Sequence, residues 1–354
     1  MFSFRTTPLR DQLDRALLEG RVAVFTNGAS SWDAFSGGYL HELFAERGNL
    51  VKVFLPDERE IAPGTAHIDF DPDELGGLDA VVVEIQDVGV RYFPFTVDVL
   101  RLMSALNTLE DAPSLYVVDH PNPAGRYVEG SMPSGESDQW TPAVAHRHGL
   151  TLGELCHLYA DEIGARYALH IISAEAAATA RTLMPWTVPP ASDFSGVFTP
   201  FFYSGGSLWA ETNINPGIGT ARPYEFFGAP FVKAGKDALP MPEGVLARPC
   251  SFVPLSGRYE GEVCHGYQLL LQAGVAYNSL LHTVRLIRYF QEHYSEFRIM
   301  DSLYGKVADA VIAEYLRGGI TFDIVEEHIK GEEQKWIRKS KRYLLYDEVP
   351  VRIK

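Results

Sequence analysis

The first half of the chain alternates short apolar runs with amphipathic segments, and this alternation constrains the fold more than any other feature. Four runs rich in Val, Leu and Phe lie at residues 21–26, 50–55, 80–85 and 115–119. Helical patterns lie near them, at residues 9–18, 33–46 and 96–106. Strands that alternate with helices form βαβ units, so the pattern predicts a Rossmann-like α/β domain whose parallel sheet is covered on both faces.

The second half differs in residue composition and in the order of its predicted helices and strands. Thr151 and Glu154 form a Thr-x-x-Glu capping box that predicts a further helix, and residues 168–173 predict a further strand. Residues 185–230 are dense in Pro, Gly, Ser, Thr and aromatics, and are too long for a plain connector. Beyond them come strand-like runs at 251–254 and 267–272 and helical patterns at 279–292, 303–316 and 323–339.

A chain of 354 residues is longer than a typical single domain. We therefore expect a Rossmann-like α/β domain over residues 1–198 and a smaller α+β domain over residues 199–354, which closes one wall of a cleft.

Charge and cysteine content exclude several classes of protein. The formal net charge of −15 is unsuited to a phosphate-binding surface, so we expect no nucleic-acid partner. The spacing of Cys156, Cys250 and Cys264 fits neither a disulfide framework nor a zinc site. We expect no metal and no cofactor. The first residues lack the apolar segment of an export signal and no run is long enough to span a membrane, which predicts a cytoplasmic protein. Export stays open as an alternative if the sequence is a piece of a longer protein. The oligomeric state stays open.

Polar side chains follow each of the four predicted strands. In open α/β sheets the ligand crevice lies at the carboxyl ends of the strands, so we expect these side chains to line a substrate site. In chain order they are Asn27, then Asp57 and Glu58, then Glu84, Gln86, Asp87 and Arg91, and finally Asp119, His120 and Asn122.

Glu84 has two interpretations. A carboxylate at the end of a buried strand carries a heavy desolvation cost unless it has a partner. It is either part of a structural ion pair with Arg91 or a carboxylate on the floor of a cleft, tuned by burial for proton transfer or for binding substrate. The loop from Asp119 to Pro123 is likewise either a stiff strand exit or a frame that fixes ligand-binding side chains.

Three more candidates follow this loop. Glu129 lies close behind it and could act as a catalytic carboxylate. His148 directly precedes the capping box, and Glu154 is either a helix-capping residue or a second catalytic carboxylate. No carboxylate lies at metal-ligand spacing from His148, so the histidine predicts no metal site.

The segment from Trp209 to Arg222 combines an aromatic ring with carboxylate, amide and hydroxyl groups. Carbohydrate sites use this mixture, because the ring takes the apolar face of the sugar and the polar groups bind its hydroxyls. We expect substrate contacts from Trp209, Glu211, Asn213, Thr220 and Arg222. The alternative is a turn that supports the domain junction. The sequence lacks a dinucleotide loop, a nucleophile elbow and a P-loop, which leaves carboxylate chemistry on a polar substrate.

These motifs occur in the same order in the exo-β-N-acetylmuramidase family, glycoside hydrolase family 171, long catalogued as a domain of unknown function. The chain resembles it from about residue 20 to residue 255, with matching motifs at residues 84–92, 119–123, 128–130, 148–155, 211–213 and 228–230. The resemblance implies a Rossmann-like N-terminal domain, a smaller C-terminal α/β domain and removal of N-acetylmuramic acid from the non-reducing ends of peptidoglycan fragments.

Glycosidases usually use two carboxyl groups. The resemblance offers Glu84, Asp87, Asp119, Glu129 and Glu154 for these roles, and Asp57 or Glu58 if the first loop supplies the acid.

The chain departs from the family pattern in three motifs, and a family stretch beyond the first of them is shortened here. Pro56-Asp57-Glu58-Arg59 stands where the family has Pro-Glu-His-Gly, and His120 and Ile218 each stand where the family has Arg. These departures keep two alternatives open. One is a non-catalytic cell-wall sugar-binding protein that has lost the acid of the first loop. The other is a hydrolase or transferase for another anionic metabolite, bound by Arg91 and Arg222.

Overall fold

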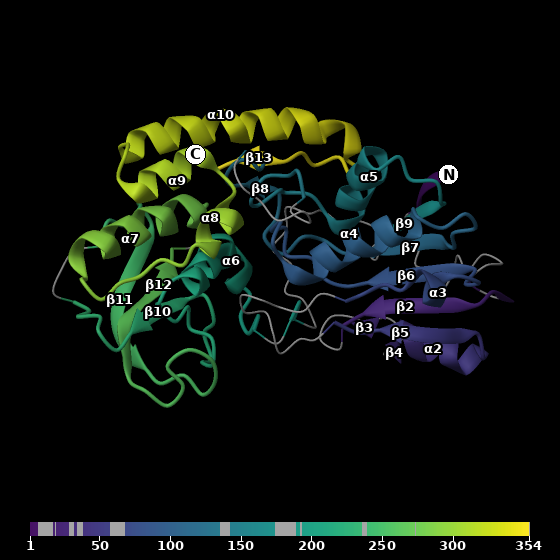
Figure 1. Cartoon of the computed structure of the whole chain (residues 1–354), viewed down its shortest axis with the longest axis horizontal. Helices are drawn as coiled ribbons and strands as arrows, with labels where there is room; N and C mark the ends of the chain where they lie inside the picture. The colour runs from purple at the N-terminus through teal and green to yellow at the C-terminus, as the bar shows by residue number, and fades with distance from the viewer. Residues whose placement is uncertain are drawn as a thin grey trace. The chain divides into compact units, whose positions relative to one another are not determined.

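The structure is a computed structural model that describes residues 1–5, 17, 19–27, 32–33, 38–56, 68–134, 142–173, 189–191, 193–235, 239–272 and 274–353. The chain divides into two compact units (Figure 1). Unit 1 contains Met1–Arg126, Gly149–Ser192 and Lys339–Pro350, and unit 2 contains Tyr127–His148, Asp193–Arg338 and Val351–Lys354. Each unit is therefore built from three separate stretches of sequence.

Unit 1 is built on a six-stranded parallel sheet. The strand order is β1-β9-β7-β6-β2-β5, and every neighbouring pair is parallel. The strands are β1 (Phe2–Arg5), β2 (Val22–Thr26), β5 (Leu50–Phe54), β6 (Ala80–Glu84), β7 (Ser114–Asp119) and β9 (Leu169–Ser173). The predicted parallel sheet is confirmed, and β1 adds an edge strand that the sequence pattern did not indicate.

The sheet reverses its direction of winding between β2 and β6. From β2 the chain continues to β5 on one side, and then returns to β6 on the other side of β2 and proceeds outwards through β7. Such a switch point opens a crevice at the carboxyl ends of the two strands. Thr26 and Glu84 are Cα partners at that end of the β2–β6 pair, so Glu84 lies at the switch point.

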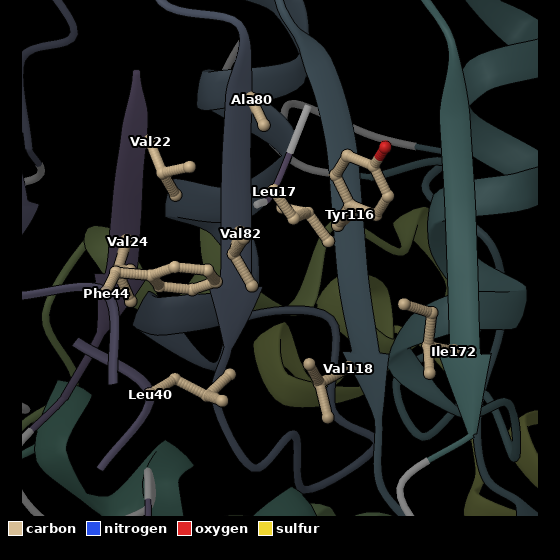
Figure 2. Packing of buried hydrophobic residues seen from close by; sticks show 10 residues of the cluster. All are labelled: Leu17, Val22, Val24, Leu40, Phe44, Ala80, Val82, Tyr116, Val118 and Ile172. Carbon is tan, nitrogen blue, oxygen red and sulfur yellow. The ribbon is translucent and has the colours of Figure 1, made fainter. Parts of the chain in front are cut away.

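One face of the sheet carries a packed apolar cluster. Residues two apart on a strand point to the same face, so alternate positions of the central strands contribute to it. The buried members are Leu17, Val22, Val24, Ala80, Val82, Tyr116, Val118 and Ile172, with Leu40 and Phe44 from a helix (Figure 2). Burial of these side chains fixes which strand ends lie side by side.

The helices of unit 1 follow the expected alternation with one correction. They are α2 (Leu40–Arg47), α3 (Pro72–Leu75), α4 (Pro94–Leu106) and α5 (Leu152–Glu162). The capping box of α5 is confirmed, since Thr151 accepts from the backbone N–H of Glu154 and Glu154 accepts from that of Thr151. The prediction of a helix from residue 33 is wrong: β3 (Trp32–Asp33) pairs with β4 (Gly38–Tyr39), and α2 begins only at Leu40, since glycine at position 38 is a poor helix former. The predicted helix at residues 9–18 lies almost wholly outside the described residues.

Unit 2 combines a small antiparallel sheet with helices. The sheet order is β10-β12-β11, and β8 and β13 form a separate parallel pair. The strands are β8 (Tyr127–Val128), β10 (Phe226–Ala229), β11 (Val245–Phe252), β12 (Cys264–Leu271) and β13 (Val351–Arg352), and the helices are α6 (Thr199–Gly206), the 3-10 helix η3 (Ser207–Glu211), α7 (Ser279–His293), α8 (Ser302–Val307), α9 (Ala310–Arg317) and α10 (Phe322–Ser340). The predicted α+β character is confirmed.

The single helix predicted over residues 303–316 is wrong. Ala308 has a φ of +47°, which ends α8 in the left-handed region. The side chain of Asp309 then accepts from the backbone N–H groups of Val311 and Ile312 and starts α9. An aspartate at the N-cap satisfies N–H groups of the first turn, which have no carbonyl partner within the helix.

Within the described residues, no helix combines the length and apolarity needed to cross a bilayer.

Candidate active site

The carboxyl ends of three neighbouring strands place polar side chains at one edge of the unit 1 sheet. Asn27 follows β2, Glu84 ends β6, and His120 follows Asp119 at the end of β7. These strands are adjacent in the order β7-β6-β2. These three strand ends therefore lie side by side, and their role in a substrate site stays a prediction. Asn27 is buried, and its Nδ2 donates to the carbonyl oxygen of Pro190 at 2.9 Å.

Glu84 is a buried carboxylate with one oxygen left over. Its side chain is only 4% exposed, and its Oε1 lies 3.8 Å from Nε2 of His120, whose side chain is 20% exposed. Oε2 of Glu84 makes no hydrogen bond to any residue that the structure describes. An unsatisfied buried oxygen costs about 1–3 kcal/mol, so Oε2 is the oxygen of Glu84 that has room for a further partner such as water or a ligand.

The two loops beside Glu84 are fastened to each other. Nε2 of Gln86 donates to the carbonyl oxygens of Asp87 and Pro121, at 2.8 and 3.0 Å. Gly89 has a φ of +75°, and a Cβ at this position would lie 2.1 Å from Nδ2 of Asn122. Nδ2 of Asn122 itself donates to the Leu150 carbonyl oxygen at 3.0 Å. The loop after β6 is therefore joined to the loop after β7 by a hydrogen bond and by close packing.

Asp87 is held within its own loop. Oγ1 of Thr96 donates to its Oδ1 at 2.7 Å. Burial raises the pKa of Asp87 to about 6, although the bonds from Thr96 and from the backbone of Gly89 and Val88 act in the opposite direction. Asp87 is therefore a carboxyl group that retains its proton at a higher pH than an exposed aspartate does.

Asp119 is held by groups that the sequence did not indicate. It accepts from Oγ1 of Thr151 at 2.7 Å, from the backbone N–H of Gly153 at 2.8 Å and from the hydroxyl of Tyr346 at 2.8 Å. Burial raises the pKa of Asp119 to about 6, and the charge of Glu154 adds to the rise while the three hydrogen bonds oppose it. Tyr346 comes from the last segment of the chain, and no motif near it points to this contact.

Glu154 is engaged in a buried ion pair. Both of its oxygens accept from the guanidinium of Arg126, and Nη2 of Arg126 lies 2.9 Å from Oε1. Oε1 also accepts from the backbone N–H of Leu345 at 3.0 Å. Together with the capping box, these contacts give Glu154 a structural role in unit 1, which is one of the two interpretations of this residue given above. Its predicted role in catalysis stays a prediction.

Two further candidates lie in unit 2, where they hold that unit together. Oε1 of Glu129 lies 2.9 Å from Nη1 of Arg147, and its Oε2 accepts from Oγ of Ser279 and from the backbone N–H of Leu280 at the start of α7. His148 is fully buried, and its carbonyl oxygen accepts from Nε1 of Trp336 at 2.8 Å.

The segment from Trp209 onwards is packed inside unit 2. The ring of Trp209 is 2% exposed and stacks on Phe227 with ring centroids 5.0 Å apart. The ring of Trp209 therefore packs within its own unit, and its predicted contact with a sugar stays a prediction.

The polar side chains of this segment bond to their own unit. Glu211 pairs with Lys306 at 3.1 Å and accepts from Ser302 at 2.6 Å. Oδ1 of Asn213 accepts from the backbone N–H of Arg298 at 2.8 Å. Thr220 donates to the Gly217 carbonyl at 2.6 Å, and Arg222 pairs with Glu225 at 3.2 Å. These contacts fit the alternative interpretation, that of a supporting turn.

Of the remaining three candidates, the structure describes only Arg91. Arg91 is fully buried in the loop after β6. Asp57 and Glu58 lie outside the described residues. No group of three His, Cys, Asp or Glu side chains with the geometry of a metal site occurs within the part of the chain that the structure describes.

Family models decide the relationship of the chain. A model described as exo-beta-N-acetylmuramidase NamZ, N-terminal, matches residues 66–191, and its C-terminal counterpart matches residues 201–346. The chain belongs to the exo-β-N-acetylmuramidase family. Within this family, the chain is 27% identical over 290 residues to peptidoglycan beta-N-acetylmuramidase NamZ of Bacillus subtilis (strain 168), an alignment that covers 78% of this chain and 69% of that protein.

Solved structures support the fold of this exo-β-N-acetylmuramidase family member. Two crystal structures of DUF1343 family proteins from Bacteroides fragilis NCTC 9343 are similar to it. One has a TM-score of 0.73 at 19% identity and covers 94% of this chain and 96% of its own. The other has a TM-score of 0.78 at 20% identity and covers 96% and 97%. At this level of identity they show the two-part α/β fold alone.

Proposed function

We propose that this chain is a glycoside hydrolase that removes N-acetylmuramic acid from the non-reducing ends of peptidoglycan fragments. Membership of the exo-β-N-acetylmuramidase family and the name of the Bacillus relative support the proposal. The observation that carries it is Glu84, a buried carboxylate at the switch point of the sheet with Oε2 unbonded among the described residues. That is where an open α/β sheet binds its ligand.

Hydrolysis of a glycosidic bond usually needs a second carboxyl group. Asp87 and Asp119 lie in the loop after β6 and at the end of β7, and burial raises the pKa of each to about 6. A carboxyl group with such a pKa retains its proton closer to neutral pH, as a general acid requires. We propose one of these two as the partner of Glu84, while Asp57, Glu58, Glu129 and Glu154 stay predictions.

Release of a chromophore from a chromogenic β-N-acetylmuramide tests the proposal. We expect the wild-type protein to hydrolyse it, and Glu84→Gln to lower kcat by at least about 100-fold, since loss of a general acid or base costs this much. Glu162→Gln is the matched control, because Glu162 makes a partly exposed ion pair with Lys339 in the same unit. Absence of release from the wild type, while a family relative releases product in the same assay, would reject the proposal.

One observation favours a binding protein as the second candidate. Glu129, Glu154 and Glu211 are each engaged in an ion pair, which reduces the number of carboxylates that remain for catalysis. A binding protein would bind N-acetylmuramic acid saturably without turnover, and its affinity would be the same in Glu84→Gln. Calorimetry on both proteins separates this candidate from the hydrolase.

The setting of the activity is also a proposal. We propose a muramic-acid-containing carbohydrate as the partner, without nucleic acid or cofactor, in the cytoplasm. Fractionation of the producing cells, followed by immunodetection of the protein, tests the location independently of activity.

A further inference from the structure

The contact between Glu84 and His120 joins two neighbouring strands at the proposed site. Glu84 is the last residue of β6, and His120 is the first residue after β7. Nε2 of His120 approaches Oε1 of Glu84 to 3.8 Å, whereas Oε2 has no hydrogen bond among the described residues. The two oxygens of one carboxylate are therefore in different surroundings: one faces an imidazole and the other is left for another group.

The imidazole is carried by a stiff backbone. Pro121 follows it directly, and the Pro121 carbonyl accepts from Gln86 at 3.0 Å. Asn122 is fixed in turn by its bond to Leu150 and by the backbone N–H of Ala124, which donates to its Oδ1 at 2.9 Å. Gly89 lies so close to Asn122 that a Cβ would collide with it. The loop that carries His120 is therefore fastened to the loop that follows Glu84.

We propose that His120 is a positioning residue for Glu84, which holds Oε1 so that Oε2 is presented to the substrate. The inference rests on the proposed function, since it assigns Glu84 to the reaction. A separation of 3.8 Å is longer than a hydrogen bond, and such contacts often tighten when substrate binds.

Arg126 does not compete for this role, because its guanidinium is paired with Glu154. Arg126 is bound to both oxygens of Glu154. His120 is also partly exposed, unlike Glu84, so a small molecule can reach the space that its ring occupies. That exposure makes the proposal testable by chemical rescue.

Kinetics of His120→Ala on the chromogenic β-N-acetylmuramide are the first test. We expect kcat to fall about 10- to 100-fold with KM nearly unchanged, because a misplaced catalytic group costs this much. Added imidazole should restore part of kcat, and His120→Gln, which keeps a nitrogen donor, should lose less than His120→Ala. His157→Ala is the matched control, since His157 lies in the same unit and contacts Phe2 and Tyr343 instead. A rise in KM at constant kcat would assign His120 to substrate binding and overturn the proposal.

A spectroscopic measurement separates this inference from the proposed function. The ring ¹⁵N signals of His120, identified by their loss in His120→Ala, should shift in Glu84→Gln at a fixed pH, and those of His157 should not. If they shift but the wild type hydrolyses nothing, the pair stands and the proposed function fails. If the wild type hydrolyses the substrate, but the signals do not shift in Glu84→Gln and kcat does not fall in His120→Ala, the proposed function stands and the role of His120 is refuted.

Discussion

Arg126 and Glu154 form a buried ion pair inside unit 1, in which two guanidinium nitrogens face the two carboxylate oxygens. Both side chains are fully buried. Nη1 of Arg126 also donates to the Gly149 carbonyl at 3.0 Å, so the pair ties the loop after β7 to the start of α5. An ion pair of this kind is costly to break on one side, because the remaining charge stays buried without its partner.

We expect Arg126→Met to lower the free energy of unfolding by about 3–5 kcal/mol for this reason. Urea denaturation followed by circular dichroism measures it. The double variant Arg126→Met with Glu154→Gln should be less destabilised than the sum of the single changes, since it leaves no unpaired charge. Additive losses, or a loss below about 1 kcal/mol for Arg126→Met, would show that the pair contributes little.

Gly153 should not tolerate a methyl group. A Cβ at this position would lie 2.5 Å from Cγ2 of Ile171 and 2.7 Å from Cγ of Asp119, although Gly153 is inside α5. We expect Gly153→Ala to destabilise the protein by about 1–3 kcal/mol through overpacking. Gly331→Ala in α10 is the control: nothing lies within 4 Å of its Cβ position, so the better helix former should stabilise by up to about 1 kcal/mol. Equal effects in thermal denaturation would contradict the steric argument.

The hydroxyl of Tyr346 should stabilise unit 1 through Asp119. Tyr346→Phe removes a donor from a buried carboxylate, which should cost about 1–2 kcal/mol. The same bond lowers the pKa of Asp119, so its loss should raise that pKa further. Tyr343→Phe serves as control, because Tyr343 donates to Asp161, which is more than half exposed, and should change stability by less than about 0.5 kcal/mol. Chemical denaturation measures the unfolding free energy of both variants. An equal loss of stability in the two would show that the hydrogen bond to Asp119 contributes no more than the exposed one to Asp161.

Glu333 in unit 2 should make stability depend on pH. Burial raises its pKa to about 7, although the charge of Arg352 and the bond from the Gly130 backbone oppose the rise. The folded state therefore keeps a proton that the unfolded state releases near the ordinary value of 4.5. The stability that this proton contributes is fully present below that value and is lost as the pH rises through about 7.

Glu333→Gln has no such proton to lose. The unfolding free energy of the wild type, minus that of Glu333→Gln, should fall by about 2–3 kcal/mol between pH 4.5 and pH 7. Glu327→Gln on the same helix is the control, since Glu327 is 79% exposed, and its difference should stay flat. Denaturation curves across this pH range measure both. A difference that rises with pH would mean that pairing with Arg352 outweighs burial.

The sequence indicated most of unit 1 because local patterns and tertiary packing agree there. The runs ending at Thr26, Glu84 and Asp119 became neighbouring parallel strands, and their polar ends meet at one edge. The pattern failed where a local conformation depends on one residue. The left-handed Ala308 split a continuous helical pattern, and the paired β3 and β4 displaced the start of α2.

Residue type and spacing by themselves determined the parallel sheet, its polar strand ends and the candidate carboxylates, because buried strands and capping boxes leave local signatures. Only the tertiary structure decided which of these carboxylates form ion pairs or hydrogen bonds within the protein. Glu154 pairs with Arg126, and Glu129 pairs with Arg147. Asp119 accepts a hydrogen bond from Tyr346, near the far end of the chain. Glu84 has one oxygen without a hydrogen bond among the described residues. The physical reason is that a buried charge pairs with whichever group the fold brings close to it. These partners lie up to 227 residues apart in sequence, so local patterns do not reveal them.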